Sequence, residues 1–563
     1  MGAACAPGAA HAASLAPVAA ENGMVVTAQH LATRVGVDVL RRGGNAVDAA
    51  VAVGYALAVV YPAAGNLGGG GFMTLQFADG RKTFLDFREK APLAATADMY
   101  LGPDGKVVKG RSTRGQLAVA VPGTVAGLEY ARAQYGSRPR AALIAPAVRL
   151  AEHGFALEQG DVDMFARGNA DFRNDPASAA IFLKPGGSPH GVGDRLVQKD
   201  LARTLRGIAR QGPRGFYQGP VAAALVASSQ LGGGLITRAD LDQYQARELP
   251  PVECDYRGYH VVSAPPPSSG GVALCEILNI LEGYPLKDLG FRSAQGVHYQ
   301  IEAMRHTYAD RNRYLGDPGF VQNPVVRLTD KAYARGIRMQ IAPDKAGVSR
   351  DIAPGEAPQE GENTTHYSVV DRWGNAAAVT YTLNGWFGNR ITVPRTGVLL
   401  NNEMDDFTSK PGVGNQFGLV QGEANAIAPG KRPLSSMSPT IVSRDGKPVL
   451  VVGSPGGSRI ITAVTHVILN MVDYGMDVQE AVDAPRFHQQ WLPEATRLEP
   501  YALSPDTRRL LQSWGQQFTD GRPTNHLAAI AIGAPVLGGA PVGANRFYGA
   551  NDPRPRTGLA AGY

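Results

Sequence analysis

The stretch Asn363-Thr364-Thr365-His366-Tyr367-Ser368-Val369-Val370-Asp371 decides how the rest of the chain is interpreted. Residues 345–363, rich in Pro, Gly, Glu and Gln and without apolar periodicity, predict a flexible linker that ends where this strand pattern begins. If the peptide bond before Thr364 is cut, Thr364 gains an α-amine beside its hydroxyl, which places a base and a nucleophile in one residue. β-Propensity alone also explains two threonines at a strand start, so the surrounding sequence must decide.

The composition is that of a globular protein, with 44% hydrophobic and 18% charged residues among 563. The net charge of +6, from 55 basic and 49 acidic residues, is scattered along the chain. No basic patch is interleaved with aromatic residues, so we expect no nucleic-acid partner. The most apolar predicted helix, residues 46–61, is too short to span a bilayer and contains Asp48, so we expect no membrane span.

The N-terminal residues 1–20 are rich in Ala and Pro, and Ala10-His11-Ala12-Ala13 is similar to the end of a secretory signal. We interpret residues 1–20 as a signal-peptide remnant or a disordered N-terminus, and we expect a periplasmic or secreted protein. Cys5 could be a lipoprotein cysteine. Cys254 and Cys275 are neither spaced as metal ligands nor part of a dense framework, so disulfide bonds are not expected to define the fold.

Periodicity predicts helices and hairpins in both halves of the chain. The helix over residues 46–61 is apolar nearly all round, which indicates burial between layers. Residues 256–264 read as one strand. Turn signals predict three hairpins, formed by residues 72–77 with 82–87, 366–371 with 376–382, and 440–443 with 449–453. Because strands are flanked by helices without an alternating repeat, the fold class is expected to be a layered α+β sandwich.

Elimination leaves Thr364 as the candidate nucleophile. The chain has no Gly-x-Ser-x-Gly elbow and no His-Glu-x-x-His or paired-cysteine zinc pattern, so no metal is expected. An α-amine with a pKa of about 7.7 to 8.0 could take the Thr364 hydroxyl proton during attack. Before cleavage, the same hydroxyl could attack the carbonyl of Asn363 and cut the chain. Gly456 and Gly457, at a predicted strand-to-helix turn, could supply oxyanion-hole N–H groups, although an ordinary turn also explains them.

Several polar residues in the same half could hold a zwitterionic head group. An ammonium would suit Asn384, Glu403, Asp405 and Asp406, and a carboxylate would suit Ser435, Ser436 and Arg88. Each of these residues alone is also explained as a turn or cap residue. For Arg88, an ion pair with Asp86 or Glu89 is the simplest structural explanation.

Seven motifs taken together resemble the γ-glutamyltranspeptidases, which are members of the N-terminal-nucleophile hydrolase superfamily. They are Asn-Leu-Gly-Gly-Gly-Gly-Phe (66–72), Asp-Phe-Arg-Glu (86–89), Pro-Pro-Pro-Ser-Ser-Gly-Gly (265–271), Thr-Thr-His-Tyr-Ser-Val-Val-Asp (364–371), Leu-Leu-Asn-Asn-Glu-Met-Asp-Asp-Phe (399–407), Lys-Arg-Pro-Leu-Ser-Ser-Met-Ser-Pro (431–439) and Gly-Ser-Pro-Gly-Gly-Ser-Arg (453–459).

The resemblance implies a four-layer αββα sandwich that cleaves itself between Asn363 and Thr364. The products would be a large subunit, residues 21–363, and a small catalytic subunit, residues 364–563, which together form a heterodimer and one structural domain. The resemblance also implies roles for single residues: Thr364 as nucleophile, Thr382 as the hydroxyl that orients its amine, Gly456 and Gly457 as oxyanion hole, Arg88, Ser435 and Ser436 for the substrate's α-carboxylate, Asn384, Glu403 and Asp406 for its α-amine, and Phe417 in the lid loop 411–418.

The implied reaction transfers a γ-glutamyl group from glutathione or a related compound, through an ester on Thr364, to water or to an amino acid or dipeptide, without a cofactor. A glutaryl or cephalosporin acylase of the same family is the alternative, and an unprocessed, inactive binding protein is the second. Glu403 and Asp406 favour the transpeptidase, because an acidic cluster facing a group without an amine would be disfavoured.

Overall fold

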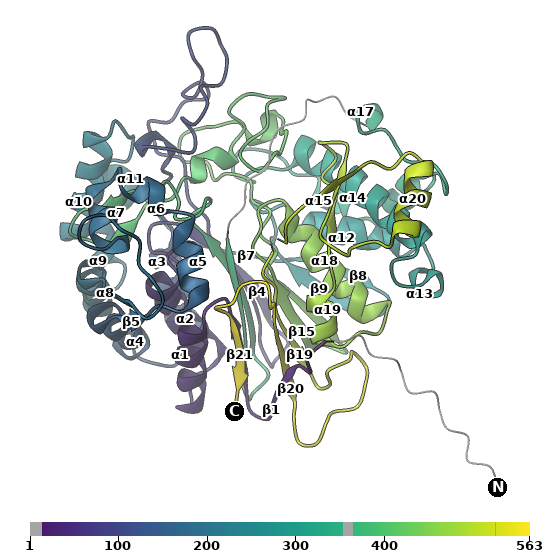
Figure 1. Cartoon of the computed structure of the whole chain (residues 1–563), viewed down its shortest axis with the longest axis horizontal. Coiled ribbons are helices and arrows are strands. Elements are labelled where there is room, and N and C mark those ends of the chain that lie inside the picture. Colours follow the sequence, from purple (N-terminus) through teal and green to yellow (C-terminus); the bar gives the residue numbers. More distant parts are fainter. Residues whose placement is uncertain (1–13, 353–363, 524) are drawn as a thin grey trace.

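The computed structural model describes residues 14–352, 364–523 and 525–563. Figure 1 shows two β-sheets in the middle of the molecule, with helices on the outer side of each. Apolar clusters fill the space between the sheets and between each sheet and its helices. The predicted four-layer αββα sandwich is therefore confirmed. Within these ranges, none of the helices has the length and hydropathy that crossing a bilayer requires.

Each large sheet contains seven strands. The first sheet runs in the order β1 (Val18–Ala20), β20 (Phe547–Asn551), β19 (Ala528–Ile532), β15 (Lys447–Gly453), β14 (Thr440–Arg444), β9 (Tyr259–Ser263) and β8 (Val252–Tyr256). The second sheet runs in the order β21 (Leu559–Gly562), β2 (Met24–Thr27), β10 (Thr365–Val370), β11 (Ala376–Thr382), β3 (Gly70–Gln76), β4 (Lys82–Phe87) and β7 (Arg247–Leu249). Strands from before and after residue 364 thus interleave in both sheets, and all these pairs are antiparallel.

The side chains that alternate along each strand explain why both faces of each large sheet are buried. In β10, Val370 packs between the sheets while its neighbour Val369 packs against the outer helices. In β15, Val451 faces the other sheet while Leu450 faces the opposite helical layer. Successive side chains of a strand point to opposite faces of the sheet. A strand that is buried on both sides therefore needs apolar residues at both its odd-numbered and its even-numbered positions.

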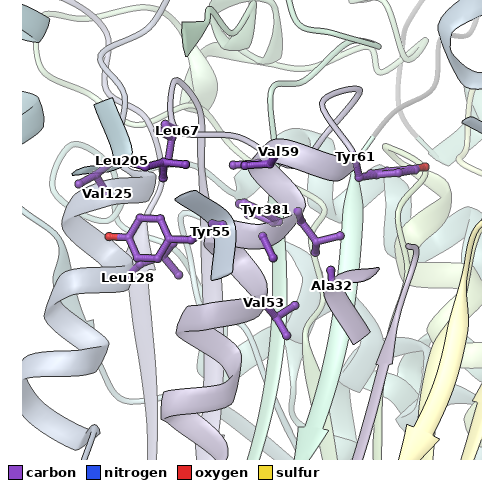
Figure 2. Close-up of a cluster of buried hydrophobic side chains, with 14 of the residues drawn as sticks. Ala32, Val53, Tyr55, Val59, Tyr61, Leu67, Val125, Leu128, Leu205 and Tyr381 are labelled. Atoms are coloured by element: carbon purple, nitrogen blue, oxygen red, sulfur yellow. The ribbon is translucent and has the colours of Figure 1, made fainter. Parts of the chain in front are cut away.

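The helices that pack with the second sheet come from the first half of the chain. They are α1 (His30–Arg41), α2 (Ala46–Val60), α3 (Thr124–Tyr135), α4 (Arg140–His153), α5 (Gln159–Ala166), α6 (Asn169–Phe172), α7 (Pro176–Phe182), α8 (Lys199–Gln211), α9 (Arg214–Tyr217), α10 (Gly219–Leu231) and α11 (Arg238–Asp242). All residues of α2 are buried, as predicted. In Figure 2, Val53, Tyr55 and Val59 of α2 lie among Leu128 of α3 and Tyr381 of β11.

The second helical layer packs mainly against the first sheet. Its members are α12 (Gly270–Leu281), α13 (Leu286–Leu289), α14 (Ala294–Tyr314), α15 (Val325–Leu328), α16 (Lys331–Arg338), α17 (Ser349–Ile352), α18 (Arg459–Val472), α19 (Val478–Asp483) and α20 (Pro505–Ser513). The short strands β5 (Phe155–Ala156), β6 (Arg195–Leu196), β12 (Thr392–Val393), β13 (Val398–Leu399), β16 (Phe487–His488), β17 (Thr496–Leu498) and β18 (Phe518–Asp520) form small sheets outside the two large ones.

The three predicted hairpins are confirmed, and the strand predicted over residues 256–264 is present as β9, although its first residues belong to β8 and to a turn. Tyr256 ends β8, and Arg257 and Gly258, both with positive φ, turn the chain back into β9. A disulfide bond between Cys254 of β8 and Cys275 of α12 was also not anticipated. It joins a strand to the helix that covers it, so a single bridge reinforces the fold without defining it.

The segment predicted as a linker starts with packed residues. Ala346 N donates to the carbonyl oxygen of Trp514, and Ser349 is buried at the start of α17. The remainder of that segment, residues 353–363, lies outside the described residues, and so do Cys5, the signal-like residues 10–13 and Asn363.

Candidate active site

Thr364 lies at one end of the space between the two sheets. It directly precedes β10, and the pairing of Thr365 with Tyr381 places Thr364 beside Thr382, the last residue of β11. Thr364 Oγ1 donates to Thr382 Oγ1 at 3.5 Å, and both side chains are buried. The alternation of β10 turns these even-numbered residues toward the first sheet, so the two hydroxyls meet at the mouth of the inner layer.

Thr382 is held by the loop that follows it. Its Oγ1 accepts a hydrogen bond from the backbone N–H of Asn384 at 2.8 Å, and its carbonyl oxygen accepts one from Asn66 Nδ2 at 2.8 Å. Asn384 has a φ of +74°, and its Nδ2 donates to the carbonyl oxygen of Asn402 at 2.9 Å. The backbone that carries both side chains is therefore fixed before any ligand arrives.

The turn at Gly456 and Gly457 lies at the same end of the first sheet, between β15 and α18. Gly456 has a φ of +128° and Gly457 a φ of +58°, which disfavours side chains at both positions. A Cβ on Gly457 would lie 2.4 Å from Phe417 Cδ1, so the Phe417 ring covers this turn. A Cβ on Gly456 would lie 2.4 Å from Asn525 Nδ2. Only glycine fits this turn, because a side chain at either position would meet a neighbouring side chain.

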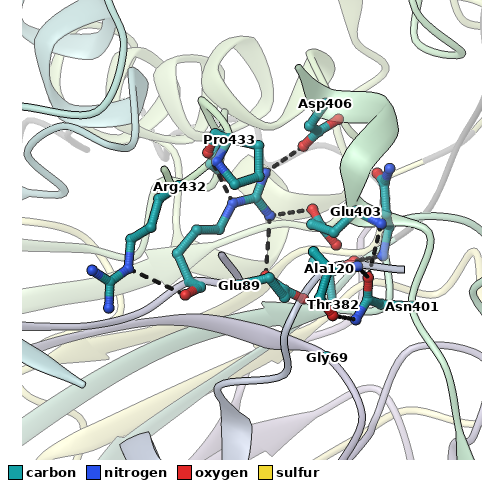
Figure 3. A network of polar contacts seen from close by, with 12 residues as sticks. Gly69, Glu89, Ala120, Thr382, Asn401, Glu403, Asp406, Arg432 and Pro433 are labelled. Atoms are coloured by element: carbon teal, nitrogen blue, oxygen red, sulfur yellow. Dashed lines mark hydrogen bonds and ion pairs between the residues drawn. The ribbon is translucent and has the colours of Figure 1, made fainter. Parts of the chain in front are cut away.

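An ion cluster forms the other side of the site, and Figure 3 shows Glu89, Glu403, Asp406 and Pro433 around one guanidinium. That group belongs to Arg88, at the end of β4, whose Nη1 bonds Glu403 and whose Nη2 bonds Asp406. Its Nε donates to the carbonyl oxygen of Pro433 at 3.1 Å, and Glu89 Oε2 lies 3.7 Å from its Nη1. Of the two ion-pair partners expected for Arg88, Asp86 or Glu89, the structure gives Glu89, because the Asp86 carboxylate contacts Arg247 and Arg432 instead.

Burial dominates the electrostatics of this ion cluster. It raises the pKa of Glu403 well above the ordinary value; Arg88 opposes the shift, while Glu89 and Asp406 add to it. Burial also raises the pKa of Glu89 to about 7, again against the pull of Arg88. Three carboxylates thus share one contacting arginine, so the cluster favours either a bound proton or an additional cation such as an ammonium group.

Ser435 and Ser436 are held by the loop that precedes α12. Ser269 donates to the carbonyl oxygen of Ser435 twice, from its backbone N at 2.8 Å and from its Oγ at 2.7 Å. Ser435 N in turn donates to the carbonyl oxygen of Pro267 at 2.8 Å. The Pro-Pro-Pro-Ser-Ser-Gly-Gly motif is therefore a rigid support for the two serines.

These groups meet in one small cavity of about 20 Å³. Its lining includes nearly all the predicted site residues, namely Arg88, Thr364, Thr382, Asn384, Glu403, Asp406, Phe417, Ser435, Ser436 and Gly457. Gly456 lies one residue away from the lining. Asp405 points elsewhere, because its Oδ1 accepts from Ser112 Oγ at 2.6 Å. In the described ranges no group of three or more His, Cys, Asp and Glu residues could hold a metal ion.

Sequence reasoning missed two residues at this site, Glu89 and Arg311. Glu89 stands in the Asp-Phe-Arg-Glu motif, where it was considered only as a partner for Arg88. Arg311 lines the cavity from α14, and no motif or spacing in the sequence marked it as a site residue. His366, by contrast, is buried between Thr380 and Ser368, within hydrogen-bond distance of both hydroxyls, and burial lowers its pKa to about 3.

An αββα sandwich with a buried threonine at the head of a central strand, facing a glycine turn, defines the class of N-terminal-nucleophile hydrolases. Comparison with known proteins gives the family. A family model described as gamma-glutamyltranspeptidase matches residues 32–562, and the chain belongs to that family of enzymes.

Individual relatives agree with this placement. The glutathione hydrolase proenzyme of Pseudomonas sp. (strain A14) is 70% identical over 98% of this chain and 96% of its own length. The glutathione hydrolase proenzyme of Escherichia coli (strain K12) is 51% identical over 97% of this chain and 93% of its own. Among solved structures, the cephalosporin acylase of Bacillus halodurans superimposes with a TM-score of 0.82 at 26% identity and covers 100% of this chain and 99% of its own.

Proposed function

We propose that the chain cleaves itself before Thr364 and then removes the γ-glutamyl group from glutathione and related γ-glutamyl compounds. One observation carries this proposal: the Thr364 hydroxyl contacts Thr382 in a cavity that also holds Gly457 and the Arg88 ion cluster. A nucleophile, an oxyanion turn and a charged head-group site within one cavity are the parts that γ-glutamyl transfer requires.

Self-cleavage would use the Thr364 hydroxyl against the preceding carbonyl. Oγ1 bonds the carbonyl carbon of Asn363, the C–N bond to Thr364 breaks, and the Oγ1 proton ends on the departing nitrogen, which becomes an α-amine. Water then hydrolyses the ester and leaves a carboxylate on Asn363. Thr382, whose Oγ1 lies 3.5 Å from Thr364 Oγ1, would orient the nucleophile in this step.

The same atoms would carry out turnover. Thr364 Oγ1 attacks the γ-carbonyl while the new α-amine takes its proton, and the turn at Gly456 and Gly457 stabilises the oxyanion. The amide C–N bond breaks, and the proton passes from the α-amine to the leaving nitrogen of cysteinylglycine. Water, an amino acid or a dipeptide then attacks the ester and takes the acyl group. This route involves no cofactor.

Recognition of the glutamyl head group would rest on the ion cluster. A substrate ammonium group would compensate Glu403 and Asp406, with Asn384 beside them, and a substrate carboxylate would take up the interaction that Arg88 now makes with those acids. Ser435 and Ser436 would add hydroxyl donors. The small cavity implies that Phe417, which covers Gly457, shifts when the substrate enters.

Subunits and location are part of the proposal. The products, residues 21–363 and 364–563, would remain together as a heterodimer. The signal-like residues 10–13 and the disulfide between Cys254 and Cys275 support a periplasmic or secreted protein, because disulfide bonds persist in oxidising compartments.

The test combines denaturing electrophoresis, N-terminal sequencing and release of p-nitroaniline from L-γ-glutamyl-p-nitroanilide. The wild type should give two bands, one starting at Thr364, and activity that rises with glycylglycine. Thr364→Ala should give one band and lose activity by at least about 10³-fold, because it lacks the nucleophile.

Thr365→Val is the matched control. The Thr365 hydroxyl is buried without a hydrogen-bond partner among the described residues, so this variant should still cleave and turn over. A single inactive wild-type band, or an active Thr364→Ala variant, would refute the proposal. Release of anilide from the glutaryl but not from the γ-glutamyl compound would instead support the acylase alternative.

A further inference from the structure

Gln490 contacts two of the segments that line the cavity. It lies just after β16, and its side chain is only 2% exposed. Its Nε2 faces three carbonyl oxygens, which are those of Phe417 at 3.3 Å, Gly418 at 3.1 Å and Leu492 at 3.2 Å. Its Oε1 accepts a hydrogen bond from Ser458 Oγ at 2.6 Å. One buried amide therefore joins the lid loop to the residue that precedes α18.

The neighbours of Gln490 fix the orientation of its amide. Carbonyl oxygens only accept hydrogen bonds, so the NH2 group must face the three carbonyls and the amide oxygen must face Ser458. His488 Nε2 also lies 2.8 Å from that oxygen and therefore donates to it. Both lone pairs of Oε1 and both hydrogens of Nε2 are thus in use, which makes this side chain a fixed link between its neighbours.

The amide oxygen of Gln490 acts on the oxyanion turn. Ser458 directly follows Gly457, and both residues line the cavity. The Ser458 hydroxyl is held by Gln490, and its carbonyl oxygen accepts a hydrogen bond from the Tyr308 hydroxyl. Since the N–H groups of the turn would have to point at a developing oxyanion, an anchored Ser458 keeps them in a productive direction. This effect requires no contact between Gln490 and the substrate.

The amide nitrogen of Gln490 holds the lid loop. The Phe417 ring covers the oxyanion turn, and among the described residues Gln490 is the only donor to the carbonyl oxygens of Phe417 and Gly418. If Phe417 shifts to admit a substrate, the carbonyl oxygen of Leu492 retains one N–H of the amide and the other N–H loses its acceptors. An unpaired buried donor is costly, so this loss favours the closed lid. Ser458 would stay bound throughout, because it contacts the amide oxygen.

We infer that Gln490 is a positioning residue for γ-glutamyl transfer. Its amide oxygen fixes the oxyanion turn through Ser458, and its amide nitrogen holds the lid loop closed through the carbonyl oxygens of Phe417 and Gly418. This inference rests on the proposed function and goes beyond it, because it assigns a role to a residue outside the head-group contacts. Since a closed lid excludes water, the contact with the lid loop should decide how much of the acyl group is lost to hydrolysis.

The experiment measures the processed enzyme on L-γ-glutamyl-p-nitroanilide at a fixed glycylglycine concentration. Ser458→Ala removes only the contact with the turn and should lower kcat about 10-fold, with KM changed by less than about 2-fold. Gln490→Met removes both contacts. It should show the same loss in kcat and should also raise the fraction of acyl groups released as free glutamate by at least about 2-fold. The double variant should fall no further in kcat than Gln490→Met, because Ser458 acts through Gln490.

Gln489→Met is the matched control. Gln489 is also a buried glutamine, 1% exposed, but its Nε2 donates to the carbonyl oxygen of Glu494 at 2.7 Å and to Thr496 Oγ1 at 3.4 Å, away from the lid loop and the turn. This variant should lower Tm as Gln490→Met does. It should leave kcat, KM and the hydrolysed fraction unchanged, so it separates a general loss of stability from a loss of positioning.

The inference is overturned if Gln490→Met keeps the wild-type kcat or the wild-type hydrolysed fraction. It is also overturned if Gln489→Met shows the same kinetic losses, or if the effects of Ser458→Ala and Gln490→Met on kcat multiply. Should Gln490→Met fail to fold or to cleave itself, Ser458→Ala decides, since a wild-type kcat for that variant overturns the inference and the expected loss supports it. Absence of self-cleavage or of γ-glutamyl release in the wild type would instead refute the proposed function, so the two failures are distinguishable.

Discussion

The apolar cluster around α2 and the ion cluster around Arg88 are both withdrawn from water, but opposite forces hold them. Around α2, Tyr55, Leu128 and Tyr381 fill space with carbon, and any loss there is a loss of packing (Figure 2). Around Arg88, Glu403 and Asp406 are charged groups that burial penalises and that depend on their partner (Figure 3). The apolar cluster can lose one side chain and stay a packed apolar core, whereas the ion cluster loses its charge balance when any one of its residues is removed.

The largest expected effect comes from removing the shared cation. Arg88→Met, made in a Thr364→Ala chain so that cleavage does not differ, should lower the free energy of unfolding by about 4 kcal/mol because Glu403 and Asp406 lose their partner. Thermal unfolding at one scan rate measures the change. Arg42→Met is the control, since the pair of Arg42 with Asp38 is exposed and its loss should not be measurable. An unchanged Tm for Arg88→Met would contradict the idea that the ion cluster depends on its arginine.

The next effect probes packing alone. Leu128→Ala should cost about 3 kcal/mol, because Leu128 is fully buried and its Cδ atoms fill the space beside Gly54. The processed variant should keep the wild-type KM for γ-glutamyl-p-nitroanilide. The same substitution at Leu231, which is 90% exposed, is the control and should change stability little. A change in KM for Leu128→Ala would mean that the apolar cluster also shapes the site.

The smallest expected effect is a pH dependence of stability that arises in the ion cluster and not in the apolar cluster. Burial raises the pKa of Glu89 to about 7, whereas its ordinary value is 4.5, so the folded chain keeps a proton that the unfolded chain releases. The Glu89 contribution to stability is therefore complete below about pH 4.5 and is lost as pH rises through 7. In the Thr364→Ala chain, adding Glu89→Gln should raise stability at pH 8 relative to pH 5, by less than about 3 kcal/mol. A difference between the two chains that is the same at pH 5 and pH 8 would contradict this shift.

Elements that follow from local sequence patterns were predictable from the sequence. Contacts among charged residues that are distant in the sequence were not. The length and apolar surface of α2 follow from residues 46–61 alone, and the three hairpins follow from their turn residues. Burial of Arg311 depends on α14, the loop before α12 and the loop at Gln421 meeting in space. A helix with charges on several sides looks solvated until its tertiary neighbours are known.

Two further differences have local causes. Arg257 and Gly258 make a tight turn that the strand-like residues around them concealed, so the predicted strand begins only at Tyr259 and β8 before the turn was not anticipated. Cys254 and Cys275 pair because the chain reverses between β9 and α12 and brings the helix over the strand. Their even number, once Cys5 is set aside as part of a signal, was the only sequence indication of a bridge.

The interleaved strand order has a consequence for the products of self-cleavage. β10 and β11 lie between β2 and β3, and β21 pairs with β2 from the other side, so strands from both sides of residue 364 are woven into one sheet. The first sheet repeats this exchange where β20 meets β1 and β14 meets β9. A cut before Thr364 would therefore break the chain without separating the two products. Dilution could not dissociate the two products unless both sheets unfolded. Products expressed separately would have to fold together to form these sheets.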